Sequence, residues 1–551
     1  MASTGQTDVR AAVSDLLFEG RVLRRAGIVG PMRPDKALRV GSTFLRWGAS
    51  PATGVTVAAI EHPHEIAILD ERGSLTWRRL HERSNALAHS FEALGIGAGD
   101  GIGVMARNHR GFLEATLAAA KLGASALYLN TMFAGPQLVE VMKREGPKAL
   151  VYDEEFGDLL AGVEPSVKRI IAWHDGAPPA EATTVEQLIA AGDPSDLAPP
   201  PGKARFVILT SGTTGTPKGA QRTSPDGLMT LASLLDMIPY RRGSTMMIAA
   251  PLFHSWGFLH FVISLPTTST MVLRRRFDPE GTLAAIERTR ADVLAVVPVM
   301  IQRILGLPEE TLGRYKLPSL KIAALSGSAL PGELATLWMD RFGDNIYNLY
   351  GSTEVSFATI ATPADLRAAP GTAGRPPRGT TVRLFDEDGK DVAPGEVGRI
   401  FVGNDMKMEG YTGGGNKEAI EGLLSSGDVG HFDPDGRLFV DGRDDEMIVS
   451  GGENVFPREV EDLLADLDGI AEVAIIGVAD EKFGQRLKAF VVLEEGASVT
   501  EAELGAHVKA NLASYKTPRE VEFLDELPRN ATGKVLKREL KARETSSRDA
   551  Q

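Results

Sequence analysis

Short apolar runs alternate with amphipathic stretches along much of the 551-residue chain. From residue 66 onward, the apolar runs IAILD (66–70), GIGVMA (101–106) and ALYLN (126–130) are separated by two helix-like stretches, 77–94 and 112–122. Strands that alternate with helices in this way build parallel sheets whose crossover helices cover the sheet faces. The pattern therefore predicts an α/β fold for the larger part of the chain.

Further apolar runs continue the pattern toward the middle of the chain, at 205–210, 245–251, 292–298 and 321–330. Several end in Gly, Ser or Pro clusters, and open α/β sheets bind ligands at such strand ends. The glycines near 95–103 do not have the G-x-G-x-x-G spacing of a dinucleotide-binding turn, so a Rossmann cofactor site is not supported. After about residue 380 the sequence changes to turns and short β runs, such as GRIFVG and GRLFVDG.

A smaller α+β unit is predicted at the C-terminal end. Helical patterns at 457–467 and 500–512 alternate with the apolar runs AEVAIIGV and LKAFVVL, and a charged helix is expected after Gly533. We expect this second domain to begin near Asp445. No internal repeat is found.

The N-terminal segment differs from the rest in its charge. Between Arg10 and Arg46 there are eight basic and three acidic residues, and the apolar residues there could share one helical face; they are Ala12, Val13, Leu16, Leu17 and Leu23. The charges follow the apolar stretch and no cleavage site is evident, which argues against a secretory signal. Two interpretations remain: a helical arm packed on the main body, which single amphipathic helices usually form, and a helix attached peripherally to a membrane surface.

Composition excludes several classes of function. The formal charge of -13 argues against a nucleic-acid-binding protein, and any anionic ligand must be held by local charge. The absence of cysteine excludes disulfides, thiolate metal sites and a cysteine nucleophile, and is compatible with a cytoplasmic location. No apolar run approaches the ~18 residues of a membrane span. The length of the chain predicts at least two domains.

The segment TSGTTGTPKG, residues 210–219, is too small and polar to contribute to a core. It follows the predicted strand 205–210, which would present it at a sheet edge. Hydroxyls, glycine N–H groups and the ammonium of Lys218 suit a polyphosphate chain. A Walker A loop is excluded, because Gly219 follows Lys218 where that motif requires Ser or Thr.

Four other segments add groups that a nucleotide-dependent reaction needs. YGSTE (350–354) combines an aromatic ring, hydroxyls and a carboxylate. The stretch 426–461 holds Asp428, Arg443 and a glycine pair, and GRP (374–376) and RNATGKVLK (529–537) complete the set.

In this order and spacing, these segments resemble the signature motifs of the adenylate-forming superfamily, which contains acyl-CoA synthetases, aryl-CoA ligases, luciferases and peptide-synthetase adenylation domains. The resemblance runs from roughly residue 50 to 540. It implies a large N-terminal domain with mixed and parallel sheets and a small, mobile α+β C-terminal domain. We expect a basic helical arm at 1–50, an adenylation domain at 51–444 and a C-terminal domain at 445–551, with Asp445 as the hinge.

The resemblance also implies roles for the motif residues. The 210–219 loop would hold the β and γ phosphates of ATP through Thr210, Ser211, Gly212, Thr213, Thr214, Gly215 and Lys218. Tyr350 would line the adenine site opposite Gly327, Ser328 and Ala329, together with Gly351 and Ser352. Asp428 would accept the ribose hydroxyls with help from Arg443. Thr353 would contact the α-phosphate, and Glu354 would hold Mg²⁺.

The implied reaction has two steps in one site. A carboxylate resists attack by a thiol, so it is first converted with ATP to an acyl-AMP, and Lys534 would neutralise the charge that develops in this step. The C-terminal domain would then rotate about Asp445. That rotation would remove Lys534 and bring Gly451 and Gly452 to a narrow tunnel for the thiol.

An uncharged acid is the expected substrate. The segment PLFHSWGF (251–258) has no acidic residue to pair with an amino-acid ammonium. His254, Trp256, Val299 and Met300 are the expected acyl-pocket residues, although each could also be an ordinary core or strand-end residue. The apolar character favours a medium- or long-chain fatty acid, with an aryl acid as an alternative.

Coenzyme A is the expected acceptor, because SGGENVFPREVE resembles the form in CoA ligases. An acyl-AMP ligase that donates to a carrier protein, and a catalytically idle nucleotide- or acyl-CoA-binding protein, are the alternatives. The sequence leaves the oligomeric state open, including a homodimer.

Overall fold

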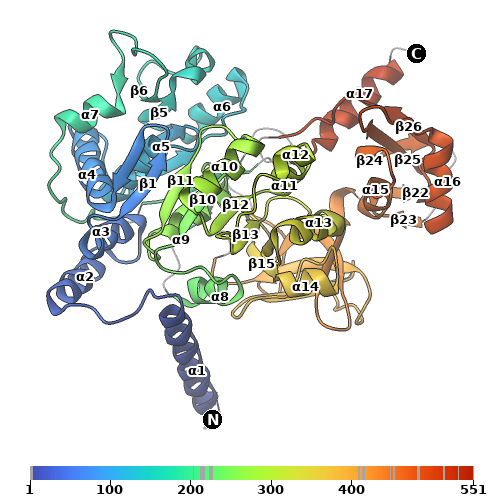
Figure 1. The fold of residues 1–551 in the computed structure, drawn as a ribbon, viewed down its shortest axis with the longest axis horizontal. Helices are drawn as coiled ribbons and strands as arrows, with labels where there is room; N and C mark the ends of the chain where they lie inside the picture. Colours follow the sequence, from blue (N-terminus) through green and yellow to red (C-terminus); the bar gives the residue numbers. More distant parts are fainter. Residues whose placement is uncertain are drawn as a thin grey trace.

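The computed structural model describes residues 4–202, 204–210, 218–222, 227–406, 410–411, 416–446, 448–450, 453–480, 484–512, 516–530 and 533–549. Two mixed eight-stranded sheets form the larger part of the molecule (Figure 1). The order across the first sheet is β15 (Ser356–Ala361), β14 (Ile346–Ser352), β13 (Ile322–Leu325), β12 (Val293–Val296), β10 (Thr245–Ile248), β11 (Thr270–Leu273), β1 (Ile66–Asp70) and β2 (Gly73–Thr76). The inner pairs are parallel, and the pairs β14–β15 and β1–β2 at the two edges are antiparallel.

The second sheet is also parallel except at one edge, where an antiparallel hairpin and a short strand are added. Its order is β18 (Gly410–Tyr411), β9 (Lys218–Arg222), β8 (Phe206–Thr210), β4 (Ser125–Tyr128), β3 (Gly101–Met105), β5 (Ala149–Asp153), β6 (Lys168–Trp173) and β7 (Thr183–Thr184). One large hydrophobic core includes buried residues from both sheets, such as Ile68 and Val104.

A five-stranded antiparallel sheet follows in the chain, as the turn-rich sequence after residue 380 predicts. Its strands are β16 (Thr381–Phe385), β17 (Gly398–Gly403), β20 (Leu423–Phe432), β19 (Ala419–Ile420) and β21 (Leu438–Arg443), which pairs with β20. This sheet has its own small core, which includes Ile400 and Leu438.

The C-terminal unit contains a fourth sheet, and Figure 1 shows it as a separate orange-to-red body beside the rest. Its strands are β22 (Ile448–Ser450), β23 (Glu453–Val455), β24 (Ile470–Asp480), β25 (Gly484–Leu493) and β26 (Glu520–Phe523). Alternate residues of β24 enter two different cores, one with the helices α15 and α16 and one with α17. The expected α/β architecture with a small α+β unit is confirmed, while the boundaries at residues 50 and 445 remain predictions.

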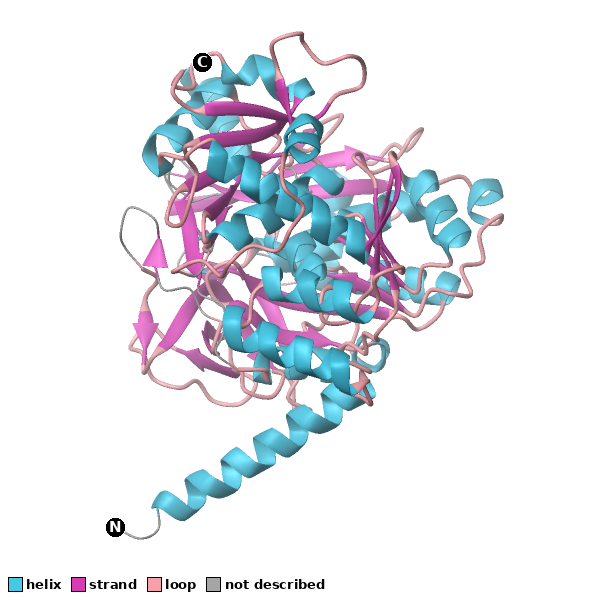
Figure 2. Ribbon diagram, turned by 90° about the vertical axis from the view of Figure 1, so that its left-hand side faces the viewer, coloured by secondary structure: helices cyan, strands magenta, loops and turns pink. Residues whose placement is uncertain are grey.

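Helices cover the sheets of the larger part and flank the sheet of the C-terminal unit (Figure 2). The α-helices are α1 (Thr4–Arg25), α2 (Pro34–Trp47), α3 (Pro51–Glu61), α4 (Trp77–Ala93), α5 (Arg110–Leu122), α6 (Gly135–Glu145), α7 (Val185–Ala191), α8 (Met229–Met237), α9 (Ser255–Ser264), α10 (Pro279–Thr289), α11 (Pro298–Leu305), α12 (Glu309–Leu312), α13 (Gly332–Phe342), α14 (Pro363–Ala368), α15 (Pro457–Ala465), α16 (Glu501–Asn511) and α17 (Lys537–Asp549). Two 3₁₀ segments are η1 (Glu154–Leu160) and η2 (Asp444–Glu446).

The N-terminal segment forms α1 and α2, and α1 projects from the body (Figure 2). Phe18, Val22 and Leu23 are buried, and α1 packs against α8. Val13, Leu16 and Leu17 are exposed. Leu23, seven residues after Leu16, lies on the same side of the helix, as the shared face requires, but it is buried where the helix meets the body. Among the helices that the structure describes, none is both long enough and apolar enough to cross a bilayer.

Candidate active site

A cleft of about 1780 Å³ lies between the larger part of the molecule and the C-terminal unit, with residues from both along its walls. Fourteen of the residues predicted for the site line it: His254, Trp256, Val299, Gly327, Ser328, Ala329, Tyr350, Gly351, Ser352, Thr353, Glu354, Asp428, Arg443 and Lys534. These residues come from segments up to 280 positions apart in the sequence, from His254 to Lys534. The fold therefore brings most of the predicted site to one place.

Strand β14 supplies one wall of this cleft. Asn348, Leu349 and Tyr350 of this strand all line the cleft, and the side chains of Asn348 and Tyr350 share one face of the strand. At Gly351 an added side chain would overlap the carbonyl oxygen of Ser356 on the neighbouring strand, so only glycine fits between the strands there. The hydroxyl of Ser352 accepts hydrogen bonds from the N–H groups of Glu354 (3.2 Å) and Val355, which fixes the turn after β14.

Asp428 is the most constrained ionisable group of the site. It lies opposite Arg443 in the β20–β21 pair, and the Arg443 guanidinium donates to its carboxylate at 3.3 Å. The Tyr350 hydroxyl donates to the other carboxylate oxygen at 2.6 Å. Burial raises the pKa of Asp428, while the charge of Arg443 and the Tyr350 hydrogen bond oppose this rise. Arg443 thus forms an ion pair with Asp428 at the wall of the cleft.

The contact between Tyr350 and Asp428 also changes the pKa of the Tyr350 phenol. Burial and the charge of Asp428 raise the pKa of its phenol far above the ordinary value, so the hydroxyl stays protonated as a donor.

The carboxylate of Glu354 accepts a hydrogen bond of 3.0 Å from the hydroxyl of Tyr411. Tyr411 belongs to β18, which pairs with β9, the strand that follows the loop 211–217. Glu354 is thereby tied to the edge of the second sheet. A single carboxylate such as that of Glu354 is sufficient protein coordination for Mg²⁺, which usually keeps waters and substrate phosphates as its other ligands.

Helix α9 supplies the apolar side of the cleft. His254 immediately precedes it, and burial lowers the pKa of the imidazole to about 4, so the ring is neutral at physiological pH. Its Nε2 atom is buried without a hydrogen-bond partner among the described residues. A neutral imidazole at the cleft wall therefore has one polar atom left for a ligand.

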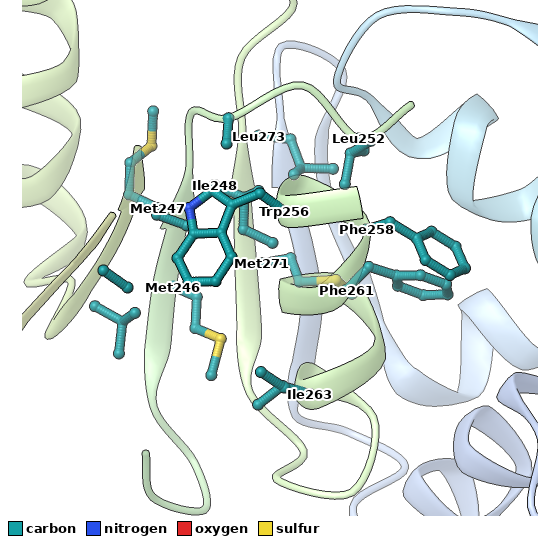
Figure 3. Close-up of a cluster of buried hydrophobic side chains, with 14 of the residues drawn as sticks. Met246, Met247, Ile248, Leu252, Trp256, Phe258, Phe261, Ile263, Met271 and Leu273 are labelled. Carbon is teal, nitrogen blue, oxygen red and sulfur yellow. The ribbon is translucent and has the colours of Figure 1, made fainter. Parts of the chain in front are cut away.

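Trp256 is held against the sheet. Its indole N–H donates to the carbonyl oxygen of Val296 at 2.9 Å, and its ring lies over β10, on the opposite side of α9 from Phe258 and Phe261 (Figure 3). Trp256 is thereby held in place at the wall of the cleft.

Aromatic rings lie further along the cleft. Phe206 and Phe258 both line it, with ring centroids 5.4 Å apart. Tyr128 packs behind them, 5.0 Å from Phe258. This wall is rigid, because its rings are packed against one another and against the core.

The C-terminal unit reaches the cleft through the turn that carries Lys534. The backbone of this turn is closed by hydrogen bonds between Asn530 and Lys534, and its Gly533 lies directly against Val299 of α11. Lys534 is exposed in the cleft, and its charge opposes the rise that burial causes in the pKa of Asp428. Lys534 and Asp428 thus line the same cleft from the two units.

Some predicted residues are placed elsewhere or lie outside the described part. Met300 does not line the cleft but is buried in the large core. Thr210 at the end of β8 pairs with Lys218 at the start of β9. Asp445 lies in η2, between the third sheet and the C-terminal unit. Seven predicted residues lie outside the described residues: Ser211, Gly212, Thr213, Thr214, Gly215, Gly451 and Gly452.

Sequence reasoning missed Asn348 and Tyr411. The side-chain oxygen of Asn348 is buried without a partner among the described residues, and the residue lines the cleft. Its position two residues before Tyr350 on one strand was a usable signal, since the two side chains must share a face. Tyr411 had no such signal, because its contact with Glu354 depends on a strand pairing across the fold.

Two family models match this chain: "AMP-binding enzyme" over residues 55–412 and "AMP-binding enzyme C-terminal domain" over residues 459–534. The first covers more than half of the chain. The chain belongs to the AMP-binding enzyme family. Its Asn348, Tyr350 and Glu354 lie within the first match, and Lys534 is the last residue of the second.

Curated relatives and solved structures agree with this assignment. The chain is 33% identical to a feruloyl-CoA synthase from Amycolatopsis sp. over 87% of its own length and 96% of the relative's. It is 32% identical to an indoleacetate–CoA ligase from Aromatoleum aromaticum over 88% and 96% of the two chains. The structure of o-succinylbenzoate CoA synthetase from Bacillus subtilis, in complex with its acyl-adenylate intermediate, superposes with a TM-score of 0.76. That similarity has 27% identity and covers 89% of this chain and 97% of the other.

Proposed function

We propose that this AMP-binding enzyme is an AMP-forming acid–CoA ligase that acts on a carboxylic acid with an uncharged, apolar acyl group. The observation that carries the proposal is one cleft that is lined by Lys534 of the C-terminal unit, by Asp428 and by aromatic side chains of the larger part. A cation that reaches a nucleotide-type site from a second unit suits a reaction in which negative charge develops at phosphorus.

ATP fits the residues of the cleft. Both oxygens of Asp428 have a second lone pair after their bonds to Tyr350 and Arg443, so the carboxylate can accept the ribose hydroxyls. The unpartnered oxygen of Asn348 is suited to accept a hydrogen bond from the exocyclic amine of adenine. Gly327, Ser328 and Ala329 line the same cleft.

In the first step, a carboxylate oxygen of the acid attacks the α-phosphorus of ATP, and the bond from that phosphorus to the β-phosphate oxygen breaks. The products are acyl-AMP and pyrophosphate. Lys534 and Thr353 hold the phosphoryl oxygens on which charge accumulates. The positioning of the acid against the α-phosphorus supplies much of the rate enhancement. Glu354, oriented by Tyr411, would hold the Mg²⁺ that neutralises the phosphates when it is bound.

In the second step, the sulfur of coenzyme A attacks the acyl carbon, the acyl–phosphate bond breaks and AMP leaves. Lys534 is not needed for this step, and the C-terminal unit has to turn away for the thiol to enter. We assign the hinge to Asp445 in η2. The expected tunnel residues Gly451 and Gly452 belong to the same proposal.

The acid pocket favours a neutral, ring-bearing acid. The side chains that line the cleft around α9 include Phe206, Phe258, Leu259 and Val262, and His254 is neutral there. Packed aromatic walls suit flat rings, which pair with them in offset or edge-to-face geometry. The feruloyl- and indoleacetate-directed relatives support the same class. A medium- or long-chain fatty acid, the class expected from the sequence, is the second candidate, because apart from His254 the side chains named here are apolar.

A product assay tests the proposal. The full chain is incubated with MgATP, coenzyme A and a panel of arylpropenoic, arylacetic, benzoic and C6–C18 fatty acids, and products are separated by liquid chromatography with mass detection. We expect acid-dependent AMP together with the acyl-CoA of at least one aryl acid. Lys509→Ala, which removes an exposed lysine on α16, is the matched control for Lys534→Ala.

The other outcomes distinguish the alternatives. Acyl-AMP without thioester would identify a ligase that donates to a carrier protein. Thioesters of fatty acids alone would select the second candidate. Nucleotide binding without any acid-dependent product would show a catalytically idle binding protein.

A further inference from the structure

Helix α2 presents an apolar stripe to solvent. Leu38 and Leu45 are 76% and 90% exposed, and Phe44 is also exposed. Leu38 and Leu45 are seven residues apart, so they lie on one side of the helix, two turns from each other. Thr43, on the opposite side, is buried where α2 packs against α3. The stripe therefore points away from the body.

Helix α1 presents a second stripe of the same kind. Leu16 and Leu17 are 70% and 69% exposed, and Val13 lies beside them. The opposite side of α1 is anchored: Phe18 and Val22 are buried there. Ion pairs with the body hold the arm in place at Arg25–Asp236 (2.9 Å) and Asp15–Arg378 (2.8 Å). The stripe is thus a stable surface of a fixed helix, which projects from the molecule in Figure 2.

Basic residues accompany both stripes. Arg39 and Arg46 are exposed on α2 and follow Leu38 and Leu45 by one position, which places them beside the stripe. Arg24 is exposed on α1, two turns after Leu17. The segment 10–46 has eight basic and three acidic residues, whereas the whole chain has a net charge of -13. The arm is therefore a positive, apolar surface on a negative protein.

We propose that α1 and α2 dock on the surface of an anionic lipid bilayer. Single exposed apolar residues are ordinary, but several at helical spacing on two helices that follow each other in the chain mark an interaction surface. Exposed Leu and Phe side chains flanked by Arg suit the boundary between acyl chains and anionic headgroups. In a two-fold contact between copies, the two positive arms would meet and repel each other, which disfavours a second copy as the occupant.

This surface is separate from the catalytic proposal. The first family match begins at residue 55, after α1 and α2. None of the stripe residues lines the cleft between the two units. Lipid binding can therefore succeed or fail whatever the enzyme's substrate is.

Vesicle co-sedimentation of the full chain, without substrates, tests the proposal. Vesicles contain either phosphatidylcholine alone or phosphatidylcholine with phosphatidylglycerol. We expect binding to the anionic vesicles that weakens as NaCl is raised, and little binding to the neutral ones. The double substitution Leu38→Ser/Leu45→Ser is expected to lower the partition coefficient about tenfold.

Two further variants complete the experiment. Arg39→Gln/Arg46→Gln keeps the apolar stripe and is expected to reduce binding to anionic vesicles only. Val397→Ser removes an exposed apolar residue between β16 and β17 and is the control for general surface hydrophobicity. Vesicle-free ligase activity and the unfolding temperature report whether each variant is folded.

The proposal is overturned if the wild-type chain does not sediment with anionic vesicles, or if the Leu38→Ser/Leu45→Ser variant binds as well as the wild type. Light scattering coupled to size-exclusion chromatography tests the other possible occupant of the stripe, a second copy of this chain. A wild-type dimer that becomes monomeric in the Leu variant, without vesicle binding, would assign the stripe to a second copy.

Discussion

Gly533 of the C-terminal unit lies so close to Val299 of α11 that a methyl group added at Gly533 would overlap the Cγ1 atom of Val299. Gly533 also has a φ of 79°, which glycine adopts at little cost. The residue is followed by Lys534. The contact therefore determines how closely the lysine-bearing turn approaches the cleft.

Gly533→Ala is predicted to slow adenylation about 100-fold, because displacing a positioned group by about 1 Å has effects of that size. Thioester formation from supplied acyl-AMP should be nearly unchanged. Both half-reactions are followed in separate assays of the same preparation.

Gly496→Ala is the control for backbone strain. Gly496 also has a φ of 79°, but no atom lies within 4 Å of an added methyl group. Its substitution should lower stability by ~1 kcal/mol without changing the rates. Combining Gly533→Ala with Val299→Ala should restore part of the lost adenylation, with Val299→Ala alone as the reference. No restoration would show that the close contact is not the cause.

Tyr350→Phe is predicted to make ATP use more sensitive to acid. The Tyr350 hydroxyl donates to the Asp428 carboxylate and so favours the ionised form, whose pKa is already raised by burial. Without that donor the pKa rises further. As the pH falls, the Asp428 carboxylate, which is proposed to bind ribose, is then protonated at a higher pH than in the wild type.

The acid limb of the pH profile of kcat/KM for ATP should move upward by about one pH unit. Tyr347→Phe, on the same strand but outside the cleft, should leave the profile in place. An unchanged pH profile in Tyr350→Phe would show that the ionisation of Asp428 does not control nucleotide binding.

Local signals predicted the elements of the fold well. The helix expected at 77–94 is α4 (Trp77–Ala93), where the Thr76 side chain accepts from the N–H of Arg79 and marks the start. The helix expected at 500–512 is α16, which begins with a capping box of Thr500 and Glu503. Periodicity and caps act within a few residues, so a single sequence is enough to find them.

Pairings across the fold could not be predicted. The edge pairing of Tyr411 with Ala220 brings together residues far apart in the sequence, and no local pattern specifies it. The same holds for Met300, whose apolar side chain suits a pocket wall and a core equally well. The structure, and not the sequence, distinguishes these cases.

Asn348→Ala is predicted to weaken discrimination between ATP and ITP. The side-chain oxygen of Asn348 is buried without a partner among the described residues, and it suits the adenine amine, which ITP lacks. The ratio of kcat/KM values for ATP and ITP should fall about tenfold. Asn348→Asp retains an acceptor and should keep most of the preference. An equal ratio in wild type and Asn348→Ala would show that Asn348 does not contact adenine.

Phe258→Ala is predicted to shift acid preference from aryl to longer-chain acids. The ring lines the cleft and packs against Phe206 and Tyr128, so its removal deepens the pocket and removes an aromatic wall. The ratio of kcat/KM for aryl and fatty acids should fall about tenfold. Phe261→Ala, a truncation of a fully buried ring on the same helix, should lower stability but not this ratio. A shift in both variants would point to a general loss of packing.

The proposed mechanism depends on a first step in which the acid is converted to an adenylate in this cleft with the help of Lys534. Its most direct test is acid-dependent exchange of labelled pyrophosphate into ATP, without coenzyme A, in the wild type and in Lys534→Ala. We predict exchange in the wild type only when the acid is present, and a loss of about 10²- to 10³-fold in the variant. Wild-type exchange that does not depend on the acid, or full exchange in Lys534→Ala, would contradict the account.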